Sequence, residues 1–141
     1  MWCSYGHRHW GRFGAAGLLV TDGASVLLQH RAAWTHEGDT WAVPGGALDS
    51  HEEAITAALR EAAEETSLDL DAVTPFGEWA DDHGGWSYIT IVARSASELK
   101  VVPINPESAA IRWWPLDDLA RLPLHHGFAA SWPTLRTLIE T

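Results

Sequence analysis

The apolar residues of the N-terminal third follow the pattern of buried strands. GAAGLLVTDGASVLLQHR (14–31) contains two apolar runs on either side of Asp22-Gly23, which predicts two strands joined by a tight turn. The polar segment AAWTHEGDT (32–40) predicts an irregular loop. TWAVPGG (40–46) predicts a short strand that ends in a glycine-rich loop.

The periodicity changes to that of a helix after residue 50. One apolar stripe forms at about 100° per residue, and its members are Ile55, Ala58, Leu59 and Ala62. Ser50 and Glu53 have the spacing of a capping box, in which each side chain accepts a hydrogen bond from the other residue's backbone N–H. We therefore predict a helix over residues 51–66 with its cap at Ser50.

The second half of the chain repeats this order of strands followed by a helix. Alternating apolar and polar residues predict the strands, and the polar segment DDHGG between the first two predicts a turn. Pro133 is expected to set the start of the last helix, because proline is favoured in a first turn. The predicted elements are strands at 73–80, 86–95 and 111–116, a turn at 81–85, a short helical segment at 116–122 and a helix at 128–140.

The order of these elements indicates an α+β fold. Each helix must bury its apolar stripe against the sheet that the strands form. We expect a mixed β-sheet flanked by helices on both faces, an α/β/α sandwich. The chain has 141 residues and shows no internal repeat or linker, so a single domain over residues 1–141 is expected.

Composition and charge narrow the functional classes. The hydrophobic fraction of 46% and the charged fraction of 20% are those of a globular protein. A formal net charge of −10 argues against binding a nucleic-acid polymer, and a phosphate ligand would need a metal cation to mediate its contacts. No apolar run approaches the roughly 20 residues of a membrane span. The first residues lack the apolar stretch of a signal peptide and Cys3 is the single cysteine, so a cytoplasmic protein is expected.

Three glutamates crowd the end of the predicted central helix. Glu61, Glu64 and Glu65 occupy a sector of roughly 100° that borders the apolar stripe. Like charges at this spacing destabilise a solvated helix by about 0.2–0.5 kcal/mol per pair. A charged helix face is most often simply solvated. Beside a strand that ends in Pro-Gly-Gly, however, the carboxylates can surround a cation, and Mg2+ prefers such oxygen ligands.

The residues around these glutamates form a spaced pattern of 23 positions. Gly46 is followed by five residues, Glu52, seven residues and then REAAEETSL (60–68). This arrangement resembles the Nudix box, G-x5-E-x7-R-E-U-x-E-E-x-G-U, in which U is a bulky aliphatic residue. The matching positions are Gly46, Glu52, Arg60, Glu61, Glu64, Glu65 and Leu68. With the flanking strands, the resemblance covers nearly the whole chain, and small MutT-like members without an extra domain are the most similar subgroup.

The resemblance implies a Nudix fold and a hydrolase of nucleoside diphosphates linked to another group X. Water would attack phosphorus with the help of Mg2+, for which Mn2+ can substitute. The implied residues are Arg60, Glu61, Glu64 and Glu65 for catalysis, Glu61, Glu64, Glu65 and the Gly45 carbonyl for metal binding, and Gly46, Glu52 and Leu68 for the structure of the box. Arg60 would orient Glu61 or Glu64 through a charge-assisted hydrogen bond. Which glutamate acts as the base is left open.

A last metal ligand of MutT-like proteins lies downstream, on a loop before a strand of the type x-W-x-x-L. IRWWPL (111–116) resembles that strand, and Glu107 precedes Trp113 by six residues, so the resemblance implies Glu107 as this ligand. A solvated loop glutamate is the alternative, and Glu78 and Asp82 are substitutes for the same role. Candidate walls for the nucleotide base are Trp34, Phe76 and Trp86, for which core packing is the alternative.

Two positions depart from the family pattern. Ala62 is small for a bulky aliphatic position. Ser67 stands where the family has a glycine just past the helix, a place where a left-handed conformation is common. Serine in that conformation would cost about 1 kcal/mol, unless the helix ends in another way. We therefore expect Ser67→Gly to raise stability slightly and to leave turnover nearly unchanged.

Two histidine-containing segments allow other interpretations. Cys3, His7 and His9 lack a second pair of zinc ligands at a typical spacing, so a surface N-terminus is the simpler interpretation. His125-His126 can reach a pocket or lie on a surface loop.

Three functional hypotheses remain. The first is a metal-dependent pyrophosphohydrolase of a nucleoside triphosphate or of an oxidised one such as 8-oxo-dGTP. ADP-ribose or a sugar nucleotide is the alternative substrate within the same class. A nucleotide-binding regulator without catalysis is the third, although the intact glutamates and the lack of a basic DNA-binding segment argue against it. Whether the protein is a monomer or a homodimer is left open.

Overall fold

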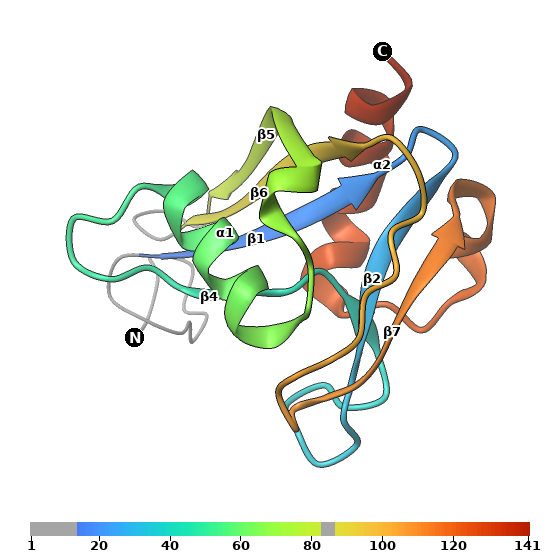
Figure 1. Ribbon diagram of the computed structural model, residues 1–141. Helices are drawn as coiled ribbons and strands as arrows, with labels where there is room; N and C mark the ends of the chain where they lie inside the picture. The colour runs from blue at the N-terminus through green and yellow to red at the C-terminus, as the bar shows by residue number, and fades with distance from the viewer. Residues whose placement is uncertain (1–13, 83–86) are drawn as a thin grey trace.

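In the computed structural model, residues 14–82 and 87–141 are described, and within them seven strands form one sheet with a helix on each face (Figure 1). The strands are β1 (Ala15–Thr21), β2 (Ser25–Arg31), β3 (Trp41–Ala42), β4 (Gly45–Ala47), β5 (Val73–Asp82), β6 (Ser87–Ser95) and β7 (Ser108–Pro115). The helices are α1 (Ala54–Glu65) and α2 (His126–Glu140), with short 3-10 segments η1 (Leu70–Ala72) and η2 (Leu116–Arg121).

The sheet is mixed. Its main order is β3-β2-β1-β6-β5, β4 pairs with β1, and β7 pairs with β2. The β1–β6 pair is parallel, whereas the other strand pairs are antiparallel. The expected mixed sheet with helices on both faces is therefore confirmed.

Two apolar clusters hold the helices to the sheet. Alternation along β1 places Leu18 and Val20 on the face that α1 covers, where Ala58 and Ala62 pack without long side chains. Leu19 lies on the opposite face, in the cluster with the apolar side chains of α2. Small residues on α1 bring its backbone close to β1 and β4, which sets the distance between the helix and the glycine loop.

The segment between β2 and α1 departs from the prediction in two places. The predicted strand over residues 40–46 is split into β3 and β4 around Val43-Pro44, and the carbonyl of Pro44 accepts the N–H of Leu18 at 3.0 Å. Pro44 has no N–H of its own, so it cannot continue a ladder as a donor.

The predicted capping box at Ser50 is wrong. α1 begins at Ala54, Glu53 is its extended N-cap residue without a side-chain cap bond, and His51 has a positive φ of 65°. The turn is instead held by Glu52, whose carboxylate accepts the N–H of Asp49 at 2.9 Å. The helix therefore starts three residues later than predicted, and Glu52, which is not part of the predicted capping box, holds the preceding turn.

The end of α1 shows how a serine is accommodated at position 67, where the family pattern has a glycine. Thr66 is extended, with φ −140° and ψ 164°, and Ser67 is not among the residues with positive φ. The Thr66 hydroxyl donates to the carbonyl of Ala62 at 2.8 Å. The N–H of Ser67 donates to the carbonyl of Val102, and the Val102 N–H donates to the Ser67 hydroxyl, both at 2.9 Å. The helix ends by joining an extended segment, so no left-handed residue is needed.

The second half follows the predicted order with shifted ends. β5 runs through Asp82, so Asp81 and Asp82 pair with β6 and are not turn residues as expected. α2 begins at His126, and Pro133 lies inside the helix, so the prediction that Pro133 sets its start is wrong. The start is fixed by His125, whose Nδ1 accepts the N–H of Gly127 at 3.1 Å. None of the helices formed by the described residues is long and apolar enough to cross a membrane.

The geometry at Ser67 reverses the expected effect of Ser67→Gly. The variant loses the hydroxyl that pairs with the N–H of Val102, and it adds backbone freedom to the unfolded chain. We expect it to lower the free energy of unfolding by about 1 kcal/mol, measured by urea denaturation. Ser67→Ala removes the hydroxyl alone and should account for part of this loss. An increase in stability for Ser67→Gly would contradict this account of the helix end.

Candidate functional site

The first feature of the site is the close approach of α1 to the glycine loop. A Cβ atom built on Gly46 would lie 2.6 Å from the carboxyl carbon of Glu61, so any larger residue would displace this side chain. At Gly45 a Cβ atom would lie 2.5 Å from the carbonyl oxygen of Ala16 and 2.6 Å from the hydroxyl of Tyr88. Both glycines therefore allow β4 to lie between β1 and the acidic face of α1.

Arg60 joins the two ends of the motif. Its guanidinium donates to both carboxylate oxygens of Glu52, at 2.8 and 2.9 Å, and to the carbonyl of Ala47 at 3.2 Å. The same group donates to Glu61 at 3.0 Å and to Glu64 at 3.3 Å. The hydrogen bonds from Arg60 lower the pKa of Glu52 to about 2. Arg60 thus contacts both glutamates that it was expected to orient, Glu61 and Glu64. Its bidentate ion pair is made with Glu52.

Glu65 has a different environment from Glu52. Burial and the negative charges of Glu61 and Glu107 raise its pKa to about 8, although the amide of Gln29 and the backbone N–H of Gly45 donate to it. Its Oε2 atom is buried without a hydrogen-bond partner. Within residues 14–82 and 87–141, this carboxyl group therefore has neutral donors and no ion pair with a cationic side chain.

The remaining predicted acidic residues take different positions. Burial raises the pKa of Glu61, while Arg60 acts in the opposite direction. The side chain of Glu64 is 56% exposed and turned to Arg60. Glu107 is exposed, and its carbonyl accepts the N–H of Ala32 at 2.8 Å, which ties the Ala32–Thr40 loop to the site. The negative charge of Glu107 contributes to the raised pKa of Glu65.

These residues fit a hard divalent cation. Among the described residues, Glu65 Oε2 is a buried atom without a hydrogen-bond partner, and the negative charges of Glu61, which Arg60 contacts, and of Glu107 act on Glu65. Carboxylate oxygens are the ligands that Mg2+ and Mn2+ prefer. Glu61, Glu64 and Glu65 do not bring three ligand atoms within 4.8 Å of one another, in part because Glu64 turns to Arg60. Glu61 and Glu65 are therefore the stronger pair, with Glu64 at the rim.

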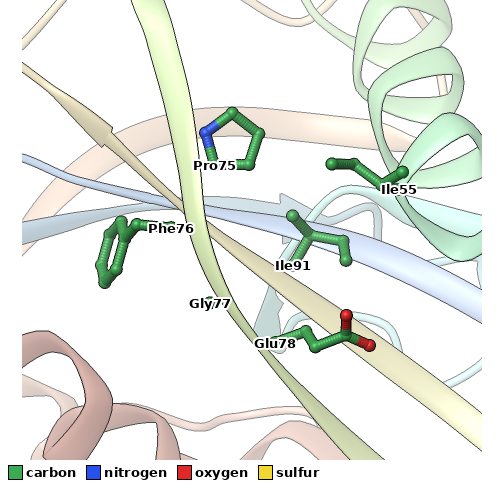
Figure 2. Close-up of a pocket in the computed structure, with 6 residues that line it drawn as sticks. All are labelled: Ile55, Pro75, Phe76, Gly77, Glu78 and Ile91. Carbon is green, nitrogen blue, oxygen red and sulfur yellow. The ribbon is translucent and has the colours of Figure 1, made fainter.

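The other candidates for metal and substrate binding lie apart from this pair. Glu78 lines a groove of about 390 Å3 with Ile55, Gly77 and Ile91, while Figure 2 shows Phe76 on the other side of β5 from Ile91. Ile55 precedes Glu61 by six residues, which is about 9 Å along a helix axis, so this groove is not the glutamate pocket. Asp82 is exposed at the end of β5.

Two of the three candidate base-stacking residues are described. Trp34 is 69% exposed in the Ala32–Thr40 loop, and Phe76 is 44% exposed with the guanidinium of Arg94 5.3 Å from its ring centroid. Core packing, the alternative for these two residues, is thereby excluded. Trp86 lies outside the described residues, as do Cys3, His7 and His9.

Gln29 and Tyr88 are site residues that sequence reasoning missed. Gln29 Nε2 donates to Glu65 Oε1 at 3.5 Å across 36 positions of sequence. Burial and the charge of Glu65 raise the pKa of Tyr88, whose hydroxyl packs against Gly45. A glutamine directly after the apolar run Val26–Leu28 was the signal available for Gln29. For Tyr88 the sequence held no such signal, because aromatic residues are common in strands.

The His125-His126 segment forms a cluster with Glu37. Among the described residues, only this trio brings three candidate ligand atoms within 4.8 Å of one another. The Glu37 carboxylate accepts the backbone N–H of His126 at 3.0 Å and lies 3.0 Å from Nε2 of His125 and 2.5 Å from Nδ1 of His126. Because Nδ1 of His125 accepts the N–H of Gly127, its proton is on Nε2, directed at Glu37. The trio is therefore a hydrogen-bonded clamp between the loop and α2.

Comparison with known proteins agrees with this geometry. The family model of the NUDIX domain matches residues 11–135. The chain belongs to the NUDIX family. Its enzymatic class is that of the Nudix hydrolases, because its similar relatives are named as diphosphatases and hydrolases.

Three relatives give the scale of the similarity. A crystal structure of RenU, a Nudix hydrolase from M. smegmatis, superposes with a TM-score of 0.89 at 47% identity, covering 97% of this chain and 91% of the other. A Mycobacterium tuberculosis protein named "Putative 8-oxo-dGTP diphosphatase 3" is 48% identical over 96% of this chain and 67% of its own length. A nucleoside triphosphate pyrophosphatase/Nudix hydrolase fusion protein of Bifidobacterium longum is 39% identical over 98% of this chain and 30% of its own length.

The raised pKa of Glu65 predicts how stability without metal depends on pH. Between the ordinary value of 4.5 and about 8, the folded protein holds a proton that the unfolded chain releases. Because the folded state binds more protons, the free energy of unfolding must fall as pH rises through this window. In EDTA, the melting temperature of the wild type should fall between pH 5 and 8 relative to that of Glu65→Gln.

The matched control for this experiment is Glu98→Gln, a change at an exposed glutamate in the loop after β6. Glu98→Gln should retain the pH dependence of the wild type. Identical pH profiles for the wild type and Glu65→Gln would show that Glu65 does not carry the proton.

Proposed function

We propose that the protein is a divalent-metal-dependent pyrophosphohydrolase that acts on a nucleoside triphosphate, with an oxidised purine nucleotide such as 8-oxo-dGTP as the preferred class. The observation that carries the proposal is the contrast between Glu52, which Arg60 pairs, and Glu65, which has a raised pKa and an unpaired Oε2. A protein that needed these glutamates only for structure would gain stability by pairing both.

Glu61, Glu65 and Glu107 are the proposed metal ligands, with Glu64 and the carbonyl of Gly45 as further oxygens. A bound Mg2+ or Mn2+ would neutralise the pyrophosphate and lower the pKa of a water molecule. The role of Arg60 is to hold Glu61 against the glycine loop while Glu52 balances its charge. The raised pKa of Glu65 means that metal binding must release its proton near neutral pH.

The base that accepts a proton from the attacking water is one of the box glutamates. Glu64 is the most exposed of them and shares Arg60 with two others, so it can accept a proton without leaving a buried charge unpaired. Glu61 and Glu65 are the alternatives. In each case Arg60 remains charged, because its carboxylate partners raise the pKa of its guanidinium.

The substrate class rests on the relatives. The M. tuberculosis protein, 48% identical, is named for activity on 8-oxo-dGTP. The exposed ring of Trp34, in a loop tied to Glu107, is the proposed stacking surface for the base. ADP-ribose, sugar nucleotides and binding without turnover are the alternatives. The cytoplasmic location is likewise a proposal from the sequence.

A nucleotide panel tests this function. With Mg2+, purified protein should release pyrophosphate and a nucleoside monophosphate from 8-oxo-dGTP faster than from dGTP, ADP-ribose or a sugar nucleotide. Glu65→Gln should lower kcat by about 100-fold or more, because it removes a proposed ligand while keeping the shape of the side chain. Chromatography of the products identifies the bond that is cleaved.

The wild type with EDTA and Glu65→Gln with Mg2+ are the two controls. Turnover of ADP-ribose above that of all triphosphates would contradict the proposed substrate class. Activity that neither EDTA nor Glu65→Gln reduces would contradict the proposed site.

A further inference from the structure

Gln29 is a buried polar residue of β2, on the face of the sheet that α1 covers. Its neighbours Leu27 and Leu28 belong to the clusters under α1 and α2, respectively. Because side chains alternate along a strand, Gln29 shares the face of Leu27, the face that α1 covers. Only 5% of Gln29 is exposed. The structure thus buries an amide at the edge of an apolar cluster, below the last turn of α1.

Among the described residues, only one of the two polar atoms of the Gln29 amide has a hydrogen-bond partner. Gln29 Nε2 donates to Glu65 Oε1 at 3.5 Å, a long hydrogen bond, while Gln29 Oε1 has no partner. The facing carboxylate has the same deficit, because Glu65 Oε2 is also buried and unpaired. Two unpaired buried acceptors on facing groups lower the stability of the fold. Stability alone therefore does not account for an amide at this position.

The chemistry of an amide suits a carboxyl group whose counter-charge is to come from a bound cation. Arg60 shows the other possibility: its guanidinium pairs with Glu52 and lowers the pKa of that carboxyl. A cation at position 29 would neutralise Glu65 in the same way and compete with a metal ion. A neutral N–H donor fixes the orientation of the carboxyl group without supplying a counter-charge, so that place is left to an external cation.

We propose that Gln29 is a positioning residue for Glu65, holding Oε1 of the carboxylate so that Oε2 is presented to a divalent cation, with Gln29 Oε1 as an additional acceptor facing the same pocket. The proposal rests on the cation site of the proposed function. Groups that orient metal ligands from outside the coordination sphere typically change metal affinity by about 10–100-fold when they are removed. Gln29 therefore belongs to the site although it lies on the sheet, far in sequence from the glutamates.

The test measures Mn2+ affinity by calorimetric titration, with no substrate present. Gln29→Met keeps nearly the same shape and removes both polar atoms. It should raise the Mn2+ dissociation constant by about 10-fold, while its melting temperature in EDTA stays equal to that of the wild type or rises. In the Mg2+-supported reaction kcat should fall and KM should stay within about two-fold, because the contact acts on the ligand and not on the nucleotide.

Two further variants separate positioning from packing. Leu28→Met changes the residue just before Gln29 in β2. The side chain of Leu28 lies in the cluster under α2, so this variant should leave the Mn2+ dissociation constant unchanged. Gln29→Glu replaces the N–H donor by a second carboxylate oxygen beside Glu65. It should lower the melting temperature in EDTA. The increase in melting temperature on addition of Mn2+ should then be larger than that of the wild type.

The outcomes distinguish this inference from the proposed function. If the wild type binds Mn2+, Glu65→Gln loses binding and Gln29→Met binds as the wild type does, the positioning role is wrong and the cation site stands. If the wild type binds no Mn2+, or binds it as well after Glu65→Gln, both proposals are overturned. An equal loss of affinity in Gln29→Met and Leu28→Met would show that packing of β2 is the cause.

Discussion

Arg60 donates hydrogen bonds to Glu52, to Glu61 and to the carbonyl of Ala47, and these contacts join α1 to the turn and to the strand in front of it. One guanidinium thereby links α1 to Ala47, which lies 13 positions before Arg60 in the sequence. Without it, the partly buried carboxylate of Glu52 would lose its counter-charge, and the close approach of Gly46 to Glu61 would bring an unpaired negative charge against the backbone. The geometry of the acidic pocket depends on this ion pair.

The same ion pair explains why Glu65 is different. Arg60 contacts Glu52, Glu61 and Glu64, and among the described residues no hydrogen bond or ion pair joins Arg60 to Glu65. The donors to Glu65 within the described part of the chain are neutral, from Gln29 and from the backbone of Gly45, and burial raises its pKa to about 8. Arg60 therefore pairs fully with Glu52 and by a single hydrogen bond with Glu61, whereas Glu65 has no contact with it, and Glu65 is the carboxyl group best placed to take an external cation together with Glu61. This division of roles within a single helix is the physical basis of the proposed activity.

The sequence predicted what depends on local spacing. The mixed sheet, the central helix and the contacts of Arg60 all follow from periodicity or from the motif around residues 46–68. It did not predict the start of α1, because Ser50 and Glu53 have the spacing of a cap whereas Glu52 is used by Arg60. Gln29 and Tyr88 were missed because their contacts join distant strands, which no local pattern encodes. The Glu37 clamp was missed for the same reason, since 89 positions separate Glu37 from His126.

The central claim is that the cation binds between Glu61 and Glu65 and not at the Glu37, His125 and His126 clamp, which is already hydrogen-bonded. Manganese scatters X-rays anomalously, so a crystal grown with Mn2+ can locate the ion directly. The account predicts an anomalous peak within bonding distance of carboxylate oxygens of Glu61 and Glu65. A peak at the clamp alone, or none near Glu65, would contradict it.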